Sequence, residues 1–284
     1  MKIALFDSAG NPVYTALEVA ALRIFIAGLV LLPVTIRSLK QIDRSKWLSI
    51  LAIGVFGNML PAYLFTSAQT EIPSAIAGML NALTPLFTMI VAALVFNTVI
   101  SLRQISGLAI GLLGALMLAM GGNLEGLGIE NGVEWWACGR VALATVFYGF
   151  SVNILKNKLQ EVPSEAIAAI ALFFVLPPAI IVLECSDVST TFTDNAHGVK
   201  GMIAVFVLAA IGTAGALVLF NAIIKKTNAL TASSVTYIIP VFAAMWGWVY
   251  GEELTLIHLV GGAVILFGVA LVNGVGKKKV GPFD

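Results

Sequence analysis

Charged residues are scarce in this sequence: Asp, Glu, Lys and Arg make up 11% of its 284 residues. A soluble domain carries roughly 25%, so these side chains cannot cover a surface that faces water. Hydrophobic residues account for 59% of the chain, and the mean hydropathy is +0.99. One large soluble core would need helices with a wide polar face, and the apolar runs have none. The composition therefore excludes a soluble globular protein and indicates a membrane protein.

Net charge, cysteine and histidine are also scarce. The formal net charge is +1, and no basic cluster is interleaved with aromatic residues, so we expect no nucleic-acid partner. Cys138 and Cys185 have neither CxxC nor metal spacing and are interpreted as ordinary thiols. The two histidines, His197 and His258, lie in or beside predicted outer loops. HExxH, GxSxG and P-loop motifs are absent, so we expect no catalytic residue, no metal site and no cofactor.

Apolar runs of about 20 residues, the length of a helix that crosses a bilayer, follow one another along the chain. Short polar breaks separate nine runs: 17–36, 47–67, 73–95, 102–121, 134–154, 165–184, 201–221, 229–250 and 256–275. We therefore expect an all-α fold, a polytopic helical bundle in a lipid bilayer.

Basic residues concentrate in alternate loops. Loop 37–46 carries four Lys and Arg residues, and twelve of the sixteen in the chain fall on the same side as this loop. Basic loops remain in the cytoplasm. The pattern predicts a multi-pass protein of the cell (inner) membrane whose C-terminal tail, 276–284, is cytoplasmic.

Two stretches of the chain resemble each other at an offset of 155 residues. Pro85 aligns with Pro240, and the apolar surroundings of the two prolines match. Internal repetition of this kind indicates two related structural units, here residues 1–121 and 133–275. Pro177 and the proline after it have no counterpart in this alignment and are interpreted as a peripheral kink.

The second unit begins with the run 134–154, for which the first unit has no full counterpart. Residues 1–6 are long enough only for the last turn or two of such a helix. We therefore expect a design of two inverted five-helix repeats, ten helices in all, of which this chain holds about nine because the first is largely missing. An odd number of crossings turns the second repeat upside down relative to the first, as in many transporters.

Motifs in both units carry a resemblance to a known family. They are the Ala20-Ala21-Leu22-Arg23 start of the first run, the pattern ALTASSVTYIIPVFAAMWGWVYGEELTLIHLVGG that begins at Ala229, and a weaker copy at 75–114. The chain resembles the EamA branch of the drug/metabolite transporter superfamily. It departs from the family pattern at Phe96-Asn97, where Gly-Glu is usual, and in the missing first helix.

The resemblance implies a secondary transporter, a permease or exporter of small organic metabolites such as amino acids, that works by alternating access around a cavity at the membrane midplane. The missing helix leaves a second interpretation open, a truncated remnant that does not transport. An intramembrane enzyme is a third hypothesis that the absence of motifs disfavours. The expected partners are a small-molecule substrate and lipid, and the oligomeric state, monomer or homodimer, stays open.

Neutral polar residues within the runs are candidates to line the cavity, because polar groups inside a membrane are costly and often functional. The candidates are Asn58, Tyr63, Asn81, Thr84, Tyr148, Asn153, Asn221, Ser233, Thr236 and Tyr237. The alternative is that they join neighbouring helices by hydrogen bonds. Asn81 and Thr236 occupy equivalent positions before the matched prolines and are the stronger candidates.

Pro85 and Pro240 are candidate hinges or helix breaks, since proline removes an intrahelical hydrogen bond and frees a carbonyl. The alternative is a static kink. Arg23 and Arg140 are interpreted as interfacial anchors or members of ion pairs, with Glu18 and Glu134 as possible partners; a gate that attracts anions is the alternative. Proton coupling has no support beyond Glu18, the acidic residue nearest to mid-membrane.

Overall fold

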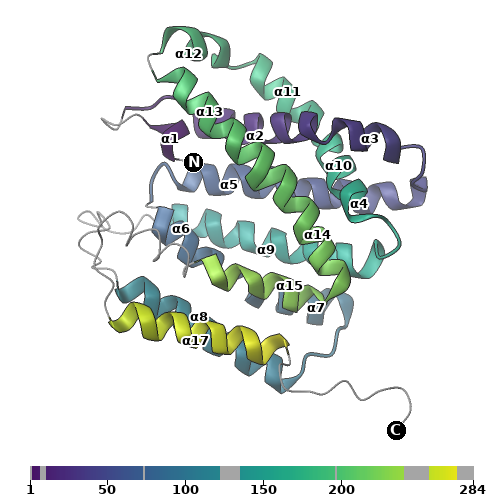
Figure 1. Cartoon of the computed structure of the whole chain (residues 1–284), viewed down its shortest axis with the longest axis vertical. Coiled ribbons are helices and arrows are strands. Elements are labelled where there is room, and N and C mark those ends of the chain that lie inside the picture. The colour runs from purple at the N-terminus through teal and green to yellow at the C-terminus, as the bar shows by residue number, and fades with distance from the viewer. Residues whose placement is uncertain are drawn as a thin grey trace.

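The computed structural model describes residues 2–6, 11–72, 74–121, 135–195, 197–239 and 256–273. Within these ranges the chain folds into a bundle of helices (Figure 1), as the composition predicted, and pairing between extended segments is limited to one bridge between Phe6 and Pro12. Four continuous helices of the described part are long and apolar enough to cross a membrane, or five if one bent pair counts as a single span.

Helices lie at each of the nine predicted runs, and the run 229–250 is described only as far as Ile239. The chain up to Gly121 forms α1 (Lys2–Leu5), α2 (Ala16–Val30), α3 (Leu32–Ser38), η1 (Arg44–Lys46), α4 (Trp47–Gly54), η2 (Val55–Met59), α5 (Leu60–Ala68), α6 (Ser74–Asn81), α7 (Thr84–Phe96) and α8 (Leu102–Gly121). The later part forms α9 (Trp135–Lys158), α10 (Ser164–Phe174), α11 (Leu176–Glu184), α12 (Val188–Asp194), α13 (Gly198–Ala209), η4 (Ala210–Gly215), α14 (Ala216–Lys226), α15 (Ala229–Ser234), η5 (Val235–Tyr237) and α17 (Leu256–Asn273).

Two spans break where a helix begins with the dipeptide Leu-Pro. A bend of 60° separates α2 from α3, and Pro33 lies in the first turn of α3. The break between α10 and α11 is built alike, with Pro177 in the first turn of α11. The helices pack crosswise, α2 against α11 and α3 against α10. The expectation that Pro177 lacks a counterpart was therefore wrong: Pro33 fills that place, but at an offset other than 155.

Two further spans each contain a π-helical turn. The helix from α4 to α5 is interrupted by η2, and the helix from α13 to α14 is interrupted by η4. In Figure 1 these spans run in opposite directions, since α4 lies at the right and α5 at the left, whereas α13 lies at the upper left and α14 at the lower right. A π-helical turn adds a residue to the helix and is frequent at functional sites.

Glycines bring α8 and α17 into backbone contact. A Cβ on Gly107 would lie 2.9 Å from the carbonyl oxygen of Gly268, and a Cβ on Gly114 would lie 2.9 Å from the carbonyl oxygen of Gly261. After a gap of one residue, which reduces the offset from 155 to 154, the sequence alignment pairs Gly107 with Gly261 and Gly114 with Gly268. Replacing each glycine by its aligned counterpart therefore turns the contact of Gly107 with Gly268 into the contact of Gly114 with Gly261, which is the contact pattern of a two-fold axis. Small residues permit such close approach between membrane helices.

The helix α9 lies in the middle of the bundle, in contact with α4 and α5 on one side and with α6, α7 and α15 on the other (Figure 1). Its residues Val141, Ala144 and Val152 are buried, and Gly149 lies against the backbone of α7 at Phe87. A helix enclosed in this way needs no polar face, in agreement with its apolar sequence.

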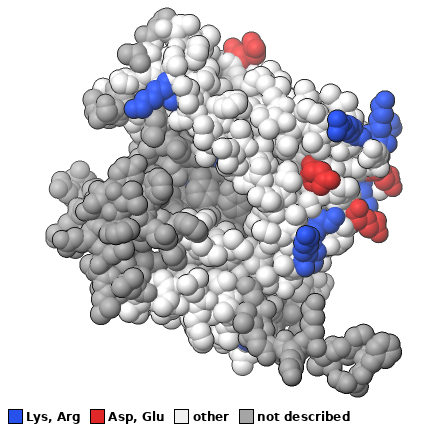
Figure 2. Space-filling model, viewed as in Figure 1, with Lys and Arg blue, Asp and Glu red and all other residues white. Residues whose placement is uncertain are grey.

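On the face shown in Figure 2, the described charged side chains lie toward the ends of the bundle. In the view of Figure 2, most lie at the right-hand end, beside the α3–α4 and α9–α10 connections, and the centre of this face carries none. At that end the Lys225 ammonium donates to the carbonyl of Val162 at 2.6 Å, and the Lys156 ammonium donates to the carbonyls of Lys225 and Thr227. Cations are favourable at these helix C-termini because of the helix dipole.

Candidate functional site

A cavity of about 600 Å³ lies between the helices, at the level of the two π-helical turns. The described residues that line it are Arg23, Ile24, Gly57, Asn58, Ala62, Phe65, Gln69, Gly78, Asn81, Thr84, Tyr148, Val152, Gly212, Thr213, Ala216, Leu217, Leu219, Phe220, Ile223, Thr236 and Ile239. Five of the ten predicted cavity residues belong to this lining, and the other five lie outside it.

Residues of the lining pair up at the offset of 155 that the sequence repeat defines. The pairs are Gly57 with Gly212, Asn58 with Thr213, Ala62 with Leu217, Phe65 with Phe220, Asn81 with Thr236, and Thr84 with Ile239. Most of the wall therefore comes from equivalent positions on two sets of helices that run in opposite directions (Figure 1).

The π-helical turns place Asn58 and Thr213 at the cavity. The Asn58 amide donates to the carbonyl of Ile53, and the Thr213 hydroxyl donates to the carbonyl of Leu208, both at 3.2 Å. Each acceptor lies five residues before its donor, so each side chain bonds across the turn that contains the extra residue. Polar side chains satisfy backbone carbonyls that irregular helices leave free inside a membrane.

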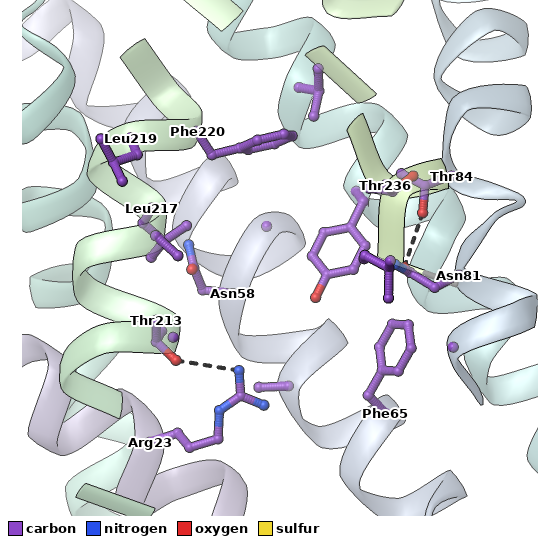
Figure 3. A pocket seen from close by; sticks show the side chains of 18 of the residues that line it. Arg23, Asn58, Phe65, Asn81, Thr84, Thr213, Leu217, Leu219, Phe220 and Thr236 are labelled. Carbon is purple, nitrogen blue, oxygen red and sulfur yellow. Dashed lines mark hydrogen bonds between the residues drawn. The ribbon is translucent and has the colours of Figure 1, made fainter. Parts of the chain in front are cut away.

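Asn81, Thr84 and Thr236 lie together on the opposite wall (Figure 3). The Thr84 hydroxyl donates to the side-chain oxygen of Asn81 at 3.2 Å, and the Thr236 hydroxyl donates to the carbonyl of Ser233 at 2.8 Å. All three flank helix breaks: α6 ends at Asn81, α7 begins at Thr84, and Thr236 lies in the short 3-10 helix η5. The structure thus brings together five predicted residues: these three, Asn58, and Tyr148 from α9.

Asn153 and Asn221 lie outside the cavity lining. Asn153 is 1% exposed, and its amide donates to the carbonyl of Thr88 on α7 at 2.9 Å and to that of Gly149 at 2.8 Å. The Asn221 amide donates to the carbonyl of Ser164 at 3.4 Å. These two side chains join neighbouring helices, the alternative that the sequence had left open.

Ser233, Tyr237 and Tyr63 also lie outside the lining. Ser233 is fully buried and donates to the carbonyl of Leu230. The Tyr237 hydroxyl donates to the carbonyl of Leu108 at 3.2 Å, and its ring lies against Gly111 of α8. Tyr63 is 43% exposed and faces away from the bundle.

Arg23 lines the cavity, whereas Glu18 and Arg140 do not. Glu18 forms a capping box at the start of α2, where its carboxylate accepts from the backbone N–H of Thr15 at 2.7 Å. Arg140 forms an ion pair with Glu71. The expected pairing of Glu18 with an arginine was therefore wrong, because Glu18 caps α2 and the carboxylate that pairs with Arg140 is that of Glu71. Glu134 lies outside the described residues.

The predicted helix break at Pro85 takes a particular form. The helix is interrupted at Ala82 and Leu83, and Pro85 lies in the first turn of α7, where a proline costs no intrahelical hydrogen bond. Pro240 lies outside the described residues, but the 3-10 helix η5 interrupts the equivalent run just before it.

Sequence reasoning missed several residues of the lining, among them Gly57, Gly212, Phe65 and Phe220. Thr213, by contrast, is a neutral polar residue in mid-run, and the offset of 155 leads to it from Asn58. The aromatic and glycine positions carried no such signal, because apolar residues abound in every helix of this chain. Among the described residues, no group of three or more His, Cys, Asp or Glu side chains lies close enough together to hold a metal ion.

Known proteins that this chain resembles are named as transporters or efflux pumps. The model of the EamA-like transporter family matches residues 4–120 and 135–274. The inner membrane transporter YedA of Escherichia coli K12 is 27% identical over 260 residues, which cover 90% of this chain and 81% of YedA. A probable amino-acid metabolite efflux pump of Salmonella typhimurium is 23% identical, covering 87% of this chain and 84% of the pump.

A further relative is also named as a transporter, and one solved structure has a similar fold. A probable terminal-alkyne amino-acid exporter of Streptantibioticus cattleyicolor is 24% identical, covering 81% of this chain and 74% of the exporter. One crystal structure superposes with a TM-score of 0.68 at 20% identity, covering 91% of this chain and 87% of the other, so the two proteins share a fold.

Proposed function

Because the chain belongs to the EamA-like transporter family, and is therefore a multi-pass membrane transporter of small metabolites, we propose that it moves amino acids or related compounds by alternating access about the central cavity. The observation that carries this proposal is the lining itself. Six pairs of equivalent positions surround one cavity, as expected where two inverted repeats meet around a substrate site.

We further propose that the repeats are residues 1–121 and 133–275. The opposed directions of the two π-containing spans and the reciprocal glycine contacts between α8 and α17 support this division. The crosswise packing of α2 on α11 and of α3 on α10 has the same symmetry.

The moving parts of this proposal are the irregular turns at the cavity. The turns η2 and η4 and the breaks at Ala82–Leu83 and η5 lie at or beside lining residues on both sides. Backbone that departs from regular α-helix has fewer fixed hydrogen bonds to lose when the helix bends. We assign Pro85 and Pro240 to the same hinges.

The proposed substrate class rests on the size and chemistry of the cavity and on the relatives. About 600 Å³ is within the range of roughly 300–1,000 Å³ that holds one small organic molecule. The wall combines aromatic side chains such as Phe65 and Phe220 with neutral hydrogen-bonding groups. Two relatives carry amino acids or their metabolites in their names.

The proposed location is the cell (inner) membrane, with the tail 276–284 in the cytoplasm. The basic connections at one end of the bundle support this orientation (Figure 2), and the relative YedA is an inner membrane transporter.

Flux into proteoliposomes tests the proposed function. Purified protein is reconstituted, and counterflow of radiolabelled amino acids is measured with and without a proton gradient. The blocking variant is Ala62→Trp, which fills the cavity, and the matched control is Tyr63→Trp, which places the same side chain on the outward face. We expect flux in the wild type and in Tyr63→Trp but not in Ala62→Trp. Flux no greater than in protein-free liposomes for every amino acid tested would contradict the proposal.

A further inference from the structure

Arg23 is the one charged side chain among the described residues that line the cavity. It lies on α2 about two turns from the start of the helix, and its guanidinium extends into the cavity toward Thr213 (Figure 3). A charge held inside a membrane protein is costly, so its position marks a functional site unless a fixed partner explains it.

The partners of Arg23 are few. Its Nη2 donates to the Thr213 hydroxyl at 3.3 Å, a long bond to a neutral acceptor, and its Nε is buried without a hydrogen bond. Glu18, the acidic residue of α2, is held at the helix start by the backbone N–H of Thr15. The described residues therefore give the guanidinium no carboxylate, although a buried cation needs an anion or several acceptors to offset its lost hydration.

Arg23 also breaks the symmetry of the cavity. The matched helix breaks after α2 and α10 place Ile167 at the position equivalent to Arg23, and Ile167 is fully buried in an apolar cluster. The six matched pairs contain no charged residue. A structural role shared by both halves would leave a similar residue in each, so such a role does not account for this cation.

We propose that Arg23 binds the carboxylate of the substrate, and that the transported compounds are small carboxylates with an apolar tail, apolar amino acids among them. A guanidinium presents paired N–H donors that match a carboxylate. The inference rests on the proposed function and adds to it the group that the substrate carries and the residue that recognises it.

The rest of the wall fits the other end of such a molecule. Phe65, Leu217 and Phe220 offer apolar surface, and Asn81 with Thr236 offers neutral hydrogen-bonding groups on the wall across from Arg23 (Figure 3). The described lining contains no Asp or Glu to pair with an ammonium group. Recognition therefore depends on the carboxylate, and the amino group adds little.

Three related probes separate the groups: phenylalanine, 3-phenylpropanoate, which lacks the amino group, and phenylalaninol, which lacks the carboxylate. Binding to purified protein and counterflow in proteoliposomes are measured for the wild type, Arg23→Gln and Arg23→Lys. Arg140→Gln is the matched control, since it removes an arginine whose partner, Glu71, lies away from the cavity.

We expect the wild type to bind both carboxylates and to bind phenylalaninol at least about tenfold more weakly. Arg23→Gln should weaken binding of both carboxylates by roughly tenfold to a hundredfold and leave phenylalaninol unchanged. Arg23→Lys should retain part of the affinity, because the charge remains without the planar fork. Arg140→Gln should bind all three probes as the wild type does.

The outcomes separate the two proposals. A wild type that carries phenylalaninol as well as the acids, or an Arg23→Gln variant with undiminished affinity for the acids, overturns the carboxylate site and leaves transport standing. A wild type that moves none of the probes and no other metabolite contradicts the proposed function, and the inference fails with it.

The melting temperature of Arg23→Gln distinguishes a substrate-binding role from a structural role, because the two roles predict changes of opposite sign. Removing an uncompensated buried charge should leave the melting temperature of Arg23→Gln equal to or above that of the wild type. Addition of 3-phenylpropanoate should raise the melting temperature of the wild type but not that of the variant. A marked fall in melting temperature together with unchanged binding would show that Arg23 only joins α2 to η4.

Discussion

Asn58 and Thr213 make the same hydrogen bond from equivalent places in the two parts of the chain: each side chain donates to the carbonyl five residues before it, at 3.2 Å. Both lie in π-helical turns, and both line the cavity. Two different side chains thus satisfy the backbone carbonyl that each π-helical turn leaves free. The cavity is therefore polar at two matched points whose hydrogen-bonding capacity is partly used by the protein itself.

Replacing these side chains should weaken the two turns. Asn58→Leu and Thr213→Val each leave a carbonyl without its side-chain donor, at a cost of about 1–3 kcal/mol in the free energy of unfolding. We expect a lower melting temperature in both variants, together with slower counterflow, because the turns lie at the cavity. Melting is followed in detergent and flux in proteoliposomes.

Thr66→Val is the control for this pair. The Thr66 hydroxyl donates to the carbonyl of Ala62 in regular α-helix, four residues before it, and Thr66 is fully buried outside the lining. Its loss should change stability but not flux per folded molecule. If Thr66→Val slowed flux as much as Asn58→Leu, the π-helical turns would have no special part in transport.

The contact of α8 with α17 should tolerate no side chain at Gly268. A Cβ there would lie 2.5 Å from the backbone nitrogen of Gly111 and 2.7 Å from the carbonyl oxygen of Gly107. These are backbone atoms, so the helices would have to separate, and we expect Gly268→Ala to lower the free energy of unfolding by about 1–3 kcal/mol. Gly262→Ala, on the same helix, meets no atom of the described residues within 4 Å and should be neutral or slightly stabilising. Equal melting temperatures for the two variants would contradict the packing described.

Asn153 should behave as a packing residue. Asn153→Leu removes two buried hydrogen bonds that tie α9 to α7 and to its own backbone, so the melting temperature should fall. The affinity of the folded fraction for a transported substrate should not change. Asn81→Leu, within the lining, should show the reverse pattern. Ligand binding after removal of aggregated protein measures both, and a weakened affinity in Asn153→Leu would assign this residue to the site.

The ion pair of Arg140 and Glu71 should contribute little to stability. The side chains are 27% and 41% exposed, and pairs of this kind are worth about 0–1 kcal/mol. Arg140→Gln and Glu71→Gln should each shift the melting temperature only slightly. The reversed pair, Arg140→Glu with Glu71→Arg, should restore what either loses. A large and non-additive loss would indicate that the pair closes one end of the cavity.

The helical bundle and its runs could be predicted from the sequence, because runs of about 20 apolar residues are visible in the sequence itself. Asn58, Asn81, Thr84, Tyr148 and Thr236 were all found as mid-run polar residues and all reach the cavity.

The neighbours of each helix could not be predicted. Asn153 and Tyr148 lie on the same enclosed helix, and nothing in its sequence shows that one contacts α7 and the other faces the cavity. Tyr237 was expected at the cavity, but it fills the space above Gly111, a contact that depends on where α8 lies.

The π-helical turns have a consequence for how this cavity can change. One residue advances an α-helix by about 100°, so the extra residue in η2 sets the angular phase of everything after it, up to Ala68. Deleting Gly57 would turn α5 by about that angle and carry Phe65 out of the cavity, and an equivalent deletion in η4 would do the same to Phe220. Inserting or deleting a single codon in either turn would therefore change which face of the following helix, α5 or α14, points into the cavity. The loops, the charges at the ends of the bundle and the glycine contact of α8 with α17 would stay as they are.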